Sequence, residues 1–177
     1  MAEKHFSLQN AKTFSQFYES CHLVVFRYIY GMTGGPLQEV EDLTAESFFR
    51  AWKKRSQFQG SEQAAIGWLL TIARNMVFDA HRRRKVHPEV ELEENWDDHY
   101  SYTQATPESR ILEREQFRIL WQLIQGLCPE HREIIILRYM LGWQVKEIAR
   151  LTNSSENAVS VNLFRTMKKI QQNWPNE

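Results

Sequence analysis

Residues 144–170 read QVKEIARLTNSSENAVSVNLFRTMKKI, and their apolar spacing predicts two helices joined by a tight turn. Asn153 tolerates the left-handed conformation in which a helix can end, and the hydroxyl of Ser155 can cap the helix that follows. Each helix has an apolar face, formed by Val145, Ile148, Ala149 and Leu151 in the first and by Val159, Leu163, Met167 and Ile170 in the second. This pattern is typical of the helix-turn-helix, whose second helix lies in the major groove of DNA.

The opposite face of the second helix carries side chains that suit duplex DNA. Asn and Arg can read base edges, Arg and Lys can hold phosphates, and Phe or Val can contact a thymine methyl group. The face consists of Glu156, Asn157, Ser160, Val161, Phe164, Arg165 and Lys168. The alternative is a solvated face on an ordinary helical hairpin, so DNA binding needs support from the rest of the chain.

The length and composition favour a small folded protein. A chain of 177 residues has room for one ordinary domain or two small ones, and 42% hydrophobic residues argue against disorder. No apolar run approaches the length of a membrane span, and the first residues lack the apolar core of a signal peptide. We therefore expect a cytoplasmic protein without membrane insertion, and its two cysteines fit a reducing compartment.

The net charge of zero conceals three blocks of different sign. Residues 1–86 carry 12 Lys and Arg against 8 Asp and Glu, and residues 110–177 carry 10 against 7. Residues 87–109 carry 7 acidic residues and no Lys or Arg. Two basic blocks therefore flank an acidic connector, and both remain compatible with nucleic-acid binding.

The remaining patterns predict an all-α protein with two small helical domains. Helices are expected over residues 13–33, 38–54 and 62–85, with the loop SQFQGS at 56–61, and they would form a three-helix bundle. After an acidic linker, helices are expected from Pro107 to Gly126 and from Pro129 to about Gly142, ahead of the helix-turn-helix. The expected organisation is a domain at 1–86, a linker at 87–106 and a domain at 107–177.

Two groups of motifs resemble those of the extracytoplasmic-function sigma factors. The first domain carries EDLTAESFFRAW at 41–52 and WLLTIARN at 68–75, followed by Asp79 and an arginine cluster. The second carries LCP at 127–129, Arg132, LRY at 137–139, EIA at 147–149, Val159 and Arg165. The match covers about residues 13–171, and two motif groups in the expected order are more specific than either alone.

The resemblance implies a factor that binds core RNA polymerase, recognises two promoter elements and helps to open the duplex. The contact with the polymerase clamp coiled coil would involve Asp42, Leu43, Glu46, Phe49 and Arg50. The alternative for these residues is a surface helix whose charges match the helix dipole. The second domain would contact the polymerase flap, the linker would thread the positively charged cleft, and an anti-sigma factor is a further expected partner.

The resemblance assigns the minus-ten promoter element to the loop and the third helix. An unstacked base needs an aromatic or apolar pocket wall, which Phe58 with Gly60 and Ser61 would supply. The alternative for Phe58 is a core plug that anchors the loop. The expected minus-ten contacts are Phe58, Gly60, Ser61, Arg74, Asn75, Asp79, Arg82 and Arg83, with Arg84 beside them. The basic cluster would also suit the C-terminal end of a helix.

The minus-thirty-five element would be bound as duplex DNA by the second helix of the helix-turn-helix. The expected contacts are Asn157, Ser160, Val161, Phe164, Arg165 and Lys168. The chain departs from the family pattern through Ala45 in place of Gln, Ala65 in place of an aromatic residue, Asn153 in place of Gly, Thr166 in place of Ala, and uncharged Ser160 and Asn162. We therefore expect the second domain alone to bind DNA weakly.

The sequence offers no pattern for catalysis, a metal or a cofactor. Cys21-His22 and Cys128-x-x-His131 lack a set of four ligands at familiar spacing, and both cysteines are expected to be buried small hydrophobic residues. No phosphate-binding loop or nucleophile elbow is present, so no catalytic residue is expected. The rival functions are a stand-alone helix-turn-helix regulator and a protein-interaction module.

Overall fold

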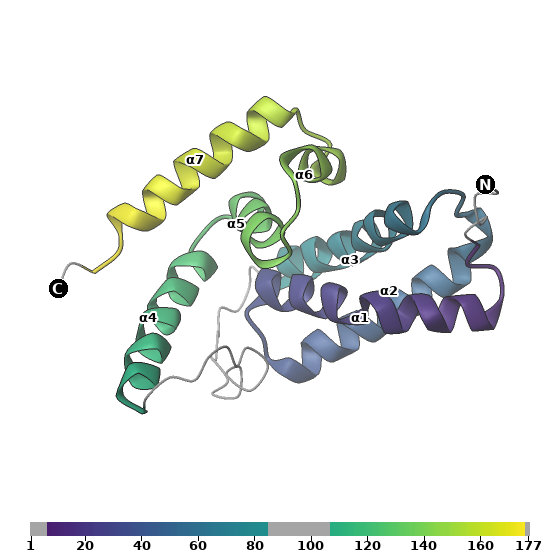
Figure 1. Ribbon diagram of the computed structural model, residues 1–177, viewed down its shortest axis with the longest axis horizontal. Coiled ribbons are helices and arrows are strands. Elements are labelled where there is room, and N and C mark those ends of the chain that lie inside the picture. Colours follow the sequence, from purple (N-terminus) through teal and green to yellow (C-terminus); the bar gives the residue numbers. More distant parts are fainter. Residues whose placement is uncertain (1–6, 85–106, 176–177) are drawn as a thin grey trace. The chain divides into compact units, whose positions relative to one another are not determined.

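The computed structural model describes residues 7–84 and 107–175, and every regular element in these two ranges is helical. The chain divides into two compact units, residues 1–89 and 90–177, and each is described by itself (Figure 1). The predicted all-α fold class is confirmed. The predicted boundaries at 86 and 107 stay predictions, because the linker lies outside the described residues.

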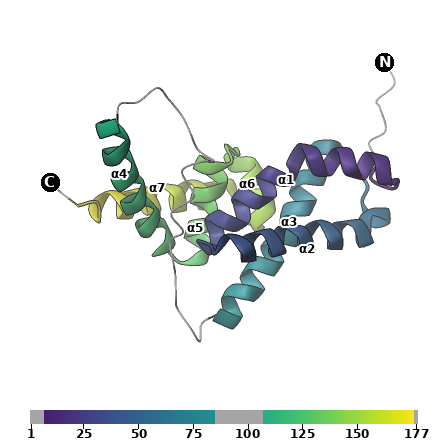
Figure 2. The ribbon, with the colours of Figure 1, turned by 90° about the horizontal axis from the view of Figure 1, so that it is seen from below.

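The described part of the first unit consists of three long helices, α1 (Ala11–Thr33), α2 (Leu37–Lys54) and α3 (Glu62–Arg84). Each of them packs against the other two (Figure 2). Asn10 caps α1 by accepting a hydrogen bond from the Thr13 backbone at 2.8 Å, and Gly34 ends it in the left-handed conformation, with φ at 81°. These local signals explain why the observed bounds lie within two residues of the predicted ones.

The core of the first unit is formed by one apolar face from each helix. Its most buried members include Phe17, Cys21, Val25, Tyr28, Ile29, Val40, Phe48, Ala51, Leu69, Leu70, Ala73 and Val77. Tyr18 lies beside these residues but keeps 43% of its surface exposed, and its ring meets that of Phe48 edge-on with the ring centroids 4.7 Å apart. A tyrosine at the rim of a core can pack its ring while its hydroxyl stays in water.

The second unit contains α4 (Pro107–Gln125), α5 (Pro129–Ile135), the π-helix η3 (Ile136–Met140), α6 (Val145–Thr152) and α7 (Glu156–Gln172). The helix expected from Pro129 to about Gly142 is observed, but its second half is π-helical. In η3 the Leu141 backbone donates to the Ile136 carbonyl at 3.0 Å, a pairing five residues apart. The unbroken apolar run at 134–137 gives no period from which this change could be predicted.

Arg132 holds the end of α4 to the start of α5 from a nearly buried position, with 7% of its surface exposed. Its guanidinium donates to the carbonyl of Gln125 and, at 3.1 Å, to the carbonyl of Leu127. The last carbonyls of a helix have no partner within that helix, so a side chain that reaches them stabilises its end. Burial lowers the pKa of Arg132, opposed by its interaction with Cys128.

The turn between α6 and α7 follows the predicted capping chemistry. Asn153 ends α6 in the left-handed conformation with φ at 53°, and the Ser154 backbone donates to the Ala149 carbonyl at 2.9 Å. The Ser155 hydroxyl accepts a hydrogen bond from the Ala158 backbone at 3.1 Å and so caps α7. Both predictions are confirmed, because each depends on neighbours within a few residues.

The apolar stripe predicted for α7 is correct at Val159, Leu163 and Ile170, which are buried, and wrong at Met167. Met167 keeps 40% of its surface exposed, whereas Thr166 keeps 1%. A helix has 3.6 residues per turn, so steps of four drift around its surface and a step of three must bring the stripe back. The inward position is therefore 166, and the helix places a hydroxyl group in the core.

Replacing Thr166 with valine is expected to stabilise the second unit by about 1 kcal/mol. The Thr166 hydroxyl oxygen is buried and has no hydrogen-bond partner among the described residues, so a methyl group of similar shape removes an uncompensated desolvation cost. Thermal unfolding by circular dichroism measures the effect. Thr152→Val is the matched control, because the Thr152 hydroxyl donates to the Ile148 carbonyl at 2.8 Å and its loss should not raise the melting temperature.

Candidate nucleic-acid and polymerase interfaces

The outward face of α2 combines charged side chains with one large aromatic ring. Phe49 is 50% exposed, and the Lys53 ammonium lies 4.2 Å from its ring centroid. Arg50 and Glu46 form an ion pair at 2.7 Å between Nε and Oε1, one helical turn apart. Asp42 is exposed on the same helix, and Leu43 is half-buried at the edge. The five residues predicted for the polymerase contact are thus surface-accessible to different degrees, and their role stays a prediction.

The loop predicted at 56–61 begins one residue earlier as a short 3-10 helix, η1 (Arg55–Gln57). Arg55 anchors it. Its guanidinium carbon lies 3.6 Å from the Trp52 ring centroid, Nη1 donates to the Trp52 carbonyl at 2.7 Å, and Nε donates to the Gln9 carbonyl at 3.1 Å. Because these contacts fix one end of the loop, the aromatic residue that follows has a defined place.

Phe58 lies half-buried against Trp68, with ring centroids 5.2 Å apart and the planes tilted by 37°. A Cβ atom at Gly60 would come within 3.1 Å of the Phe58 ring, so the absence of a side chain there lets the ring fold over the loop. Sequence reasoning missed Trp68 as the partner of Phe58, because their contact is tertiary. The packed side of Phe58 fits the plug alternative, while its exposed side leaves a surface on which a base can stack.

Ser61 and Ala65 mark the start of α3. The Ser61 hydroxyl accepts a hydrogen bond from the Ala64 backbone at 3.3 Å, so the side chain predicted for a base pocket also supports the helix start. Ala65 is completely buried. The position at which the family pattern carries an aromatic residue therefore points into the bundle here, and Trp68 and Phe58 provide the nearby aromatic surface.

Farther along α3, Asn75 is exposed and Asp79 is half-buried one turn later. Asp79 forms an ion pair with Arg82, three residues later on the same helix. The guanidinium carbon of Arg74 lies 4.5 Å from the Phe78 ring centroid, so an aromatic ring supports this cation. Arg83 is exposed, and the side chain of Arg84 lies outside the described residues. Along α3, the amide of Asn75 therefore lies on the same helix as several arginine side chains.

All six residues predicted for the minus-thirty-five contact lie exposed on α7. Phe164 is the most exposed large apolar residue, at 71%, and Val161 one turn earlier is 37% exposed. The Ser160 hydroxyl donates to the Glu156 carbonyl at 2.9 Å. Sequence reasoning missed Lys146 and Arg150, exposed on α6 four residues apart, whose basic character and helical spacing could have indicated a phosphate contact.

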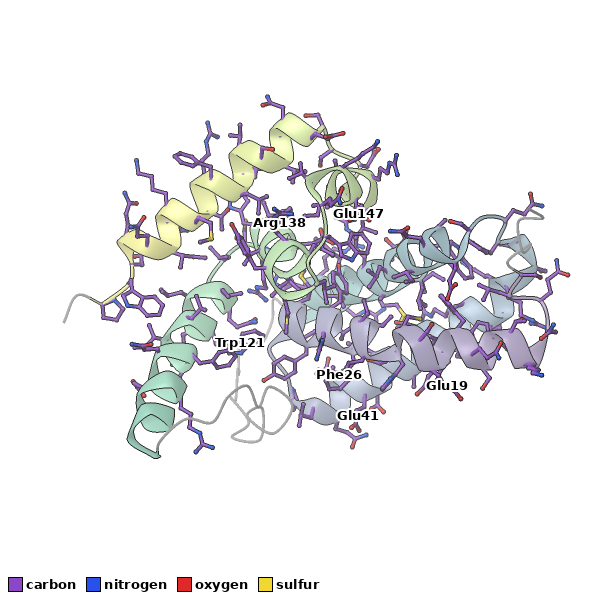
Figure 3. All side chains as sticks on the ribbon, viewed as in Figure 1. Glu19, Phe26, Glu41, Trp121, Arg138 and Glu147 are labelled. Atoms are coloured by element: carbon purple, nitrogen blue, oxygen red, sulfur yellow. The ribbon has the colours of Figure 1, made fainter. Side chains whose placement is uncertain are left out.

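Arg138, labelled in Figure 3, is a further exposed cation in the second unit, and it comes from η3. Its Nη1 donates to the Trp143 carbonyl at 2.9 Å, which holds the guanidinium beside the turn that leads into α6. At the start of α6, the Gln144 backbone donates to the Glu147 carboxylate at 2.8 Å. The entry to the helix-turn-helix is therefore fixed by hydrogen bonds from both sides.

An apolar groove of about 230 Å³ runs between α4 and the α5–η3 segment. It is lined by Phe117, Leu120, Trp121, Ile124, Ile135, Ile136, Tyr139 and Met140. Tyr139 is 60% exposed at its edge, and Trp121 is labelled in Figure 3. The sequence did not predict that these residues would border an open groove. Exposed apolar surface of this kind is typical of a protein contact.

The two cysteines differ from each other. Cys21 is buried and its thiol donates to the Phe17 carbonyl at 2.9 Å; burial raises its pKa to about 12. Cys128 is exposed, so its predicted burial is wrong. It precedes Pro129 at the start of α5, where the chain turns at the surface. Within residues 7–84 and 107–175, no group of three or more His, Cys, Asp or Glu side chains is placed to hold a metal ion.

Two family models match the chain, one in each unit. "Sigma-70 region 2" matches residues 17–86 and "Sigma-70, region 4" matches residues 117–170. The ECF RNA polymerase sigma factor BldN of Streptomyces coelicolor is 32% identical over 94% of this chain. The chain belongs to the extracytoplasmic-function sigma factors. It spans 62% of the length of BldN, and it is also similar to the sigma factor SigL of Mycobacterium tuberculosis, with 29% identity over 87% of this chain and 84% of SigL.

Two solved structures have a similar fold. The sigma factor RpoE of Bartonella quintana, solved with the anti-sigma factor NepR, matches 92% of this sigma factor and 96% of its own chain with a TM-score of 0.71. CnrH, solved with the cytosolic domain of CnrY, matches 92% of this chain and 88% of its own with a TM-score of 0.65. Both are 19% identical to this sigma factor, so these comparisons concern the fold alone.

The predicted site residues of this sigma factor fall within the two matched regions. The predicted polymerase and minus-ten residues, from Asp42 to Arg83, lie in the region 2 match, and those from Asn157 to Lys168 lie in the region 4 match. Among the described helices of this sigma factor, none combines the length and apolar character that a membrane span requires.

Proposed function

We propose that this sigma factor binds core RNA polymerase, recognises promoter DNA with both units, and directs duplex opening and transcription initiation. The observation that carries the proposal is the exposed face of α7, where an amide, two cations and two apolar side chains stand outward on the second helix of a capped helix-turn-helix. A regulator that acts alone would share this face. The matches to both sigma regions favour a sigma factor.

The first unit binds the clamp coiled coil of the polymerase through α2. Phe49 is the anchor of this contact, because a half-exposed aromatic ring can enter a pocket of the partner and contribute much of the binding energy. Asp42, Glu46 and Arg50 surround it with charges that fix orientation and exclude wrong partners. The apolar groove of the second unit is the surface that meets the polymerase flap.

The loop and α3 handle the minus-ten element as the duplex melts. Phe58 and Trp68 provide the aromatic surface for an unstacked base, and Gly60 lets the ring lie close to the loop backbone. Asn75 faces the nucleic acid with a side chain that can both donate and accept hydrogen bonds. The phosphates are held by Arg74, Arg82 and Arg83.

The second unit binds the minus-thirty-five element as a duplex. The base edges are contacted from α7, with Arg165 and Asn157 as hydrogen-bonding side chains. Lys146 and Arg150 on α6 hold the phosphate backbone as the first helix crosses it. This division of tasks assigns specificity to α7 and much of the salt-dependent affinity to both helices.

The other partners follow from the same proposal. The acidic linker at 87–106 threads the positively charged polymerase cleft and RNA exit path, where carboxylates take the place of nucleic acid and are displaced by growing RNA. An anti-sigma factor restrains the protein until its signal arrives. The site of action is the cytoplasm. No catalytic residue, metal or cofactor of this chain takes part.

In vitro transcription with purified core polymerase over a library of genomic fragments tests the proposal, with start sites read by sequencing. A sigma factor gives discrete start sites only when core polymerase is present, and Asn75→Ala and Arg165→Ala reduce them. A stand-alone regulator would instead shift duplex DNA without polymerase. A protein-interaction module would bind the polymerase without producing transcripts, and neither substitution would change its behaviour.

Replacing Phe58 with alanine is expected to reduce duplex opening by about tenfold, because base stacking on an aromatic side chain contributes about 1–3 kcal/mol. Permanganate footprinting of the minus-ten thymines measures opening, and urea denaturation measures stability. Phe26→Ala is the control, since Phe26 is a half-buried aromatic residue of α1 that has no proposed contact with DNA. If Phe58→Ala lowers stability and opening in proportion, Phe58 is a plug and not a base platform.

A further inference from the structure

The described segment ahead of α1 is held to the first unit by contacts of its own. Leu8 is 1% exposed, although it lies outside any helix. The backbone carbonyl of Gln9 accepts a hydrogen bond from Arg55 Nε at 3.1 Å, and the two residues are 46 positions apart in the sequence. A segment of this kind is ordered only where such contacts hold it, so residues 7–10 are an integral part of the bundle.

Arg55 connects this segment to the loop predicted for the minus-ten element. Its guanidinium carbon lies 3.6 Å from the Trp52 ring centroid, and Nη1 donates to the Trp52 carbonyl at 2.7 Å. The Trp52 ring in turn meets Phe14 of α1 edge-on, with the ring centroids 5.0 Å apart. The Phe58 backbone donates to the Arg55 carbonyl at 3.3 Å. Arg55 therefore links the segment ahead of α1 and the end of α2 to the residue that carries the proposed base platform.

These contacts leave Arg55 poorly placed to hold DNA itself. It is half-buried, Nε and Nη1 both donate to carbonyls of the protein, and one face of its guanidinium rests on an indole ring. A phosphate contact needs an exposed cation, and Arg83 on α3 is exposed in this way. Arg55 is instead engaged within the first unit, so its effect on DNA passes through Phe58.

The position of Phe58 depends on how firmly the loop before it is held. Its ring lies against Trp68, with the ring centroids 5.2 Å apart, and a loop held there before DNA binds loses less conformational freedom when a base enters. We propose that Leu8, Gln9 and Arg55 form a loop brace that keeps Phe58 in its base-accepting position. The inference rests on the proposed function, and it makes Arg55 a positioning residue for duplex opening and not a DNA contact.

Arg55→Lys separates a positioning role from a charge contact, because it keeps the positive charge. The single ammonium group of lysine cannot donate to two carbonyls while it lies flat on an indole ring. Arg55→Lys and Arg55→Ala are therefore both expected to lower duplex opening about two- to tenfold, the cost of ordering one side chain or short loop on binding. Permanganate footprinting with the full-length protein and core polymerase measures opening at a start site found by in vitro transcription.

Leu8→Ala tests the brace from a buried side chain that DNA cannot reach, and it should lower opening by a similar factor. Met32→Ala controls for lost stability, because Met32 is 3% exposed near the opposite end of α1. Lys12→Ala controls for a lost positive charge, at an exposed position near the start of α1. Both controls should open the promoter like the unmodified protein. Urea denaturation and titration of core polymerase accompany each variant, and the brace variants should keep their affinity for core polymerase.

The outcomes separate this inference from the function on which it rests. If the unmodified protein gives no core-dependent transcript, the proposed function fails. If transcripts appear but Arg55→Lys opens the promoter like the unmodified protein, the guanidinium contacts are not needed and the brace is overturned. Equal losses of opening in Leu8→Ala and Met32→Ala would overturn it too, because both would then reflect stability alone. A loss of core affinity as large as the loss of opening would assign the segment to the polymerase contact, which also overturns the inference.

Discussion

Arg132→Ala is expected to destabilise the second unit by about 3 kcal/mol or more. The guanidinium is nearly buried and joins the carbonyls of Gln125 and Leu127. Alanine therefore leaves one buried and one part-buried acceptor without this donor and opens a void between α4 and α5. Amide hydrogen exchange read by mass spectrometry measures the effect, because it distinguishes residues 107–175 from residues 7–84 within the intact chain.

The matched control for Arg132 is Arg118 in α4. Arg118 pairs with Glu115 at 2.6 Å between Nη2 and Oε1, but both side chains are more than half exposed, and ion pairs in water contribute little. Arg118→Ala should therefore leave the exchange of the second unit unchanged. Equal protection in Arg132→Ala and Arg118→Ala would show that the buried guanidinium does not hold the end of α4.

Phe49→Ala is expected to weaken association with core polymerase by about 30-fold or more, because removal of an aromatic hot spot from an interface costs about 2 kcal/mol or more. Phe49 is 50% exposed, so its loss should not unfold the bundle. Titration of labelled core polymerase with the full-length protein at low salt gives the affinity. The low salt concentration preserves the electrostatic contribution of Asp42, Glu46 and Arg50 to polymerase binding, because a higher ionic strength screens their charges.

Leu23 provides the control for Phe49, because it is an exposed apolar residue of the same unit, at 43%, and lies on α1 outside the proposed contact. Leu23→Ala should bind core polymerase like the unmodified protein. An unchanged affinity for Phe49→Ala would remove α2 from the interface. A loss of affinity for Leu23→Ala of the same size would instead extend the contact to α1.

The sequence was sufficient where structure depends on neighbouring residues. The left-handed Asn153, the Ser155 cap and the glycine end of α1 are local choices of backbone and side chain, and they set helix bounds within two residues of those expected. The apolar spacing along α7 also located its exposed face. The roles of the individual site residues stay predictions until the substitutions described above are measured.

The sequence was insufficient where the contacts or burial of a side chain depend on residues distant in the chain or on small differences in helical phase. The contact of Phe58 with Trp68 and the reach of Arg132 across the α4–α5 turn are tertiary, and no spacing encodes them. Met167 was placed inward because successive steps of four residues look regular in a sequence, although they drift around a helix. Cys128 was expected to be buried because cysteine usually is, whereas its place beside Pro129 is at the surface.

The number of residues in the π-helical turn η3 determines how the helices after it are oriented. A π-turn contains one residue more than an α-helical turn closed at the same place, so deleting one residue from Ile136–Met140 would allow an ordinary helix to form. Everything after the deletion would then rotate by about 100° around the helix axis. The extra residue thus sets the direction in which the chain leaves η3. A shortened protein would form its helices but direct α6 away from its packing on η3 and α7 away from its packing on α5.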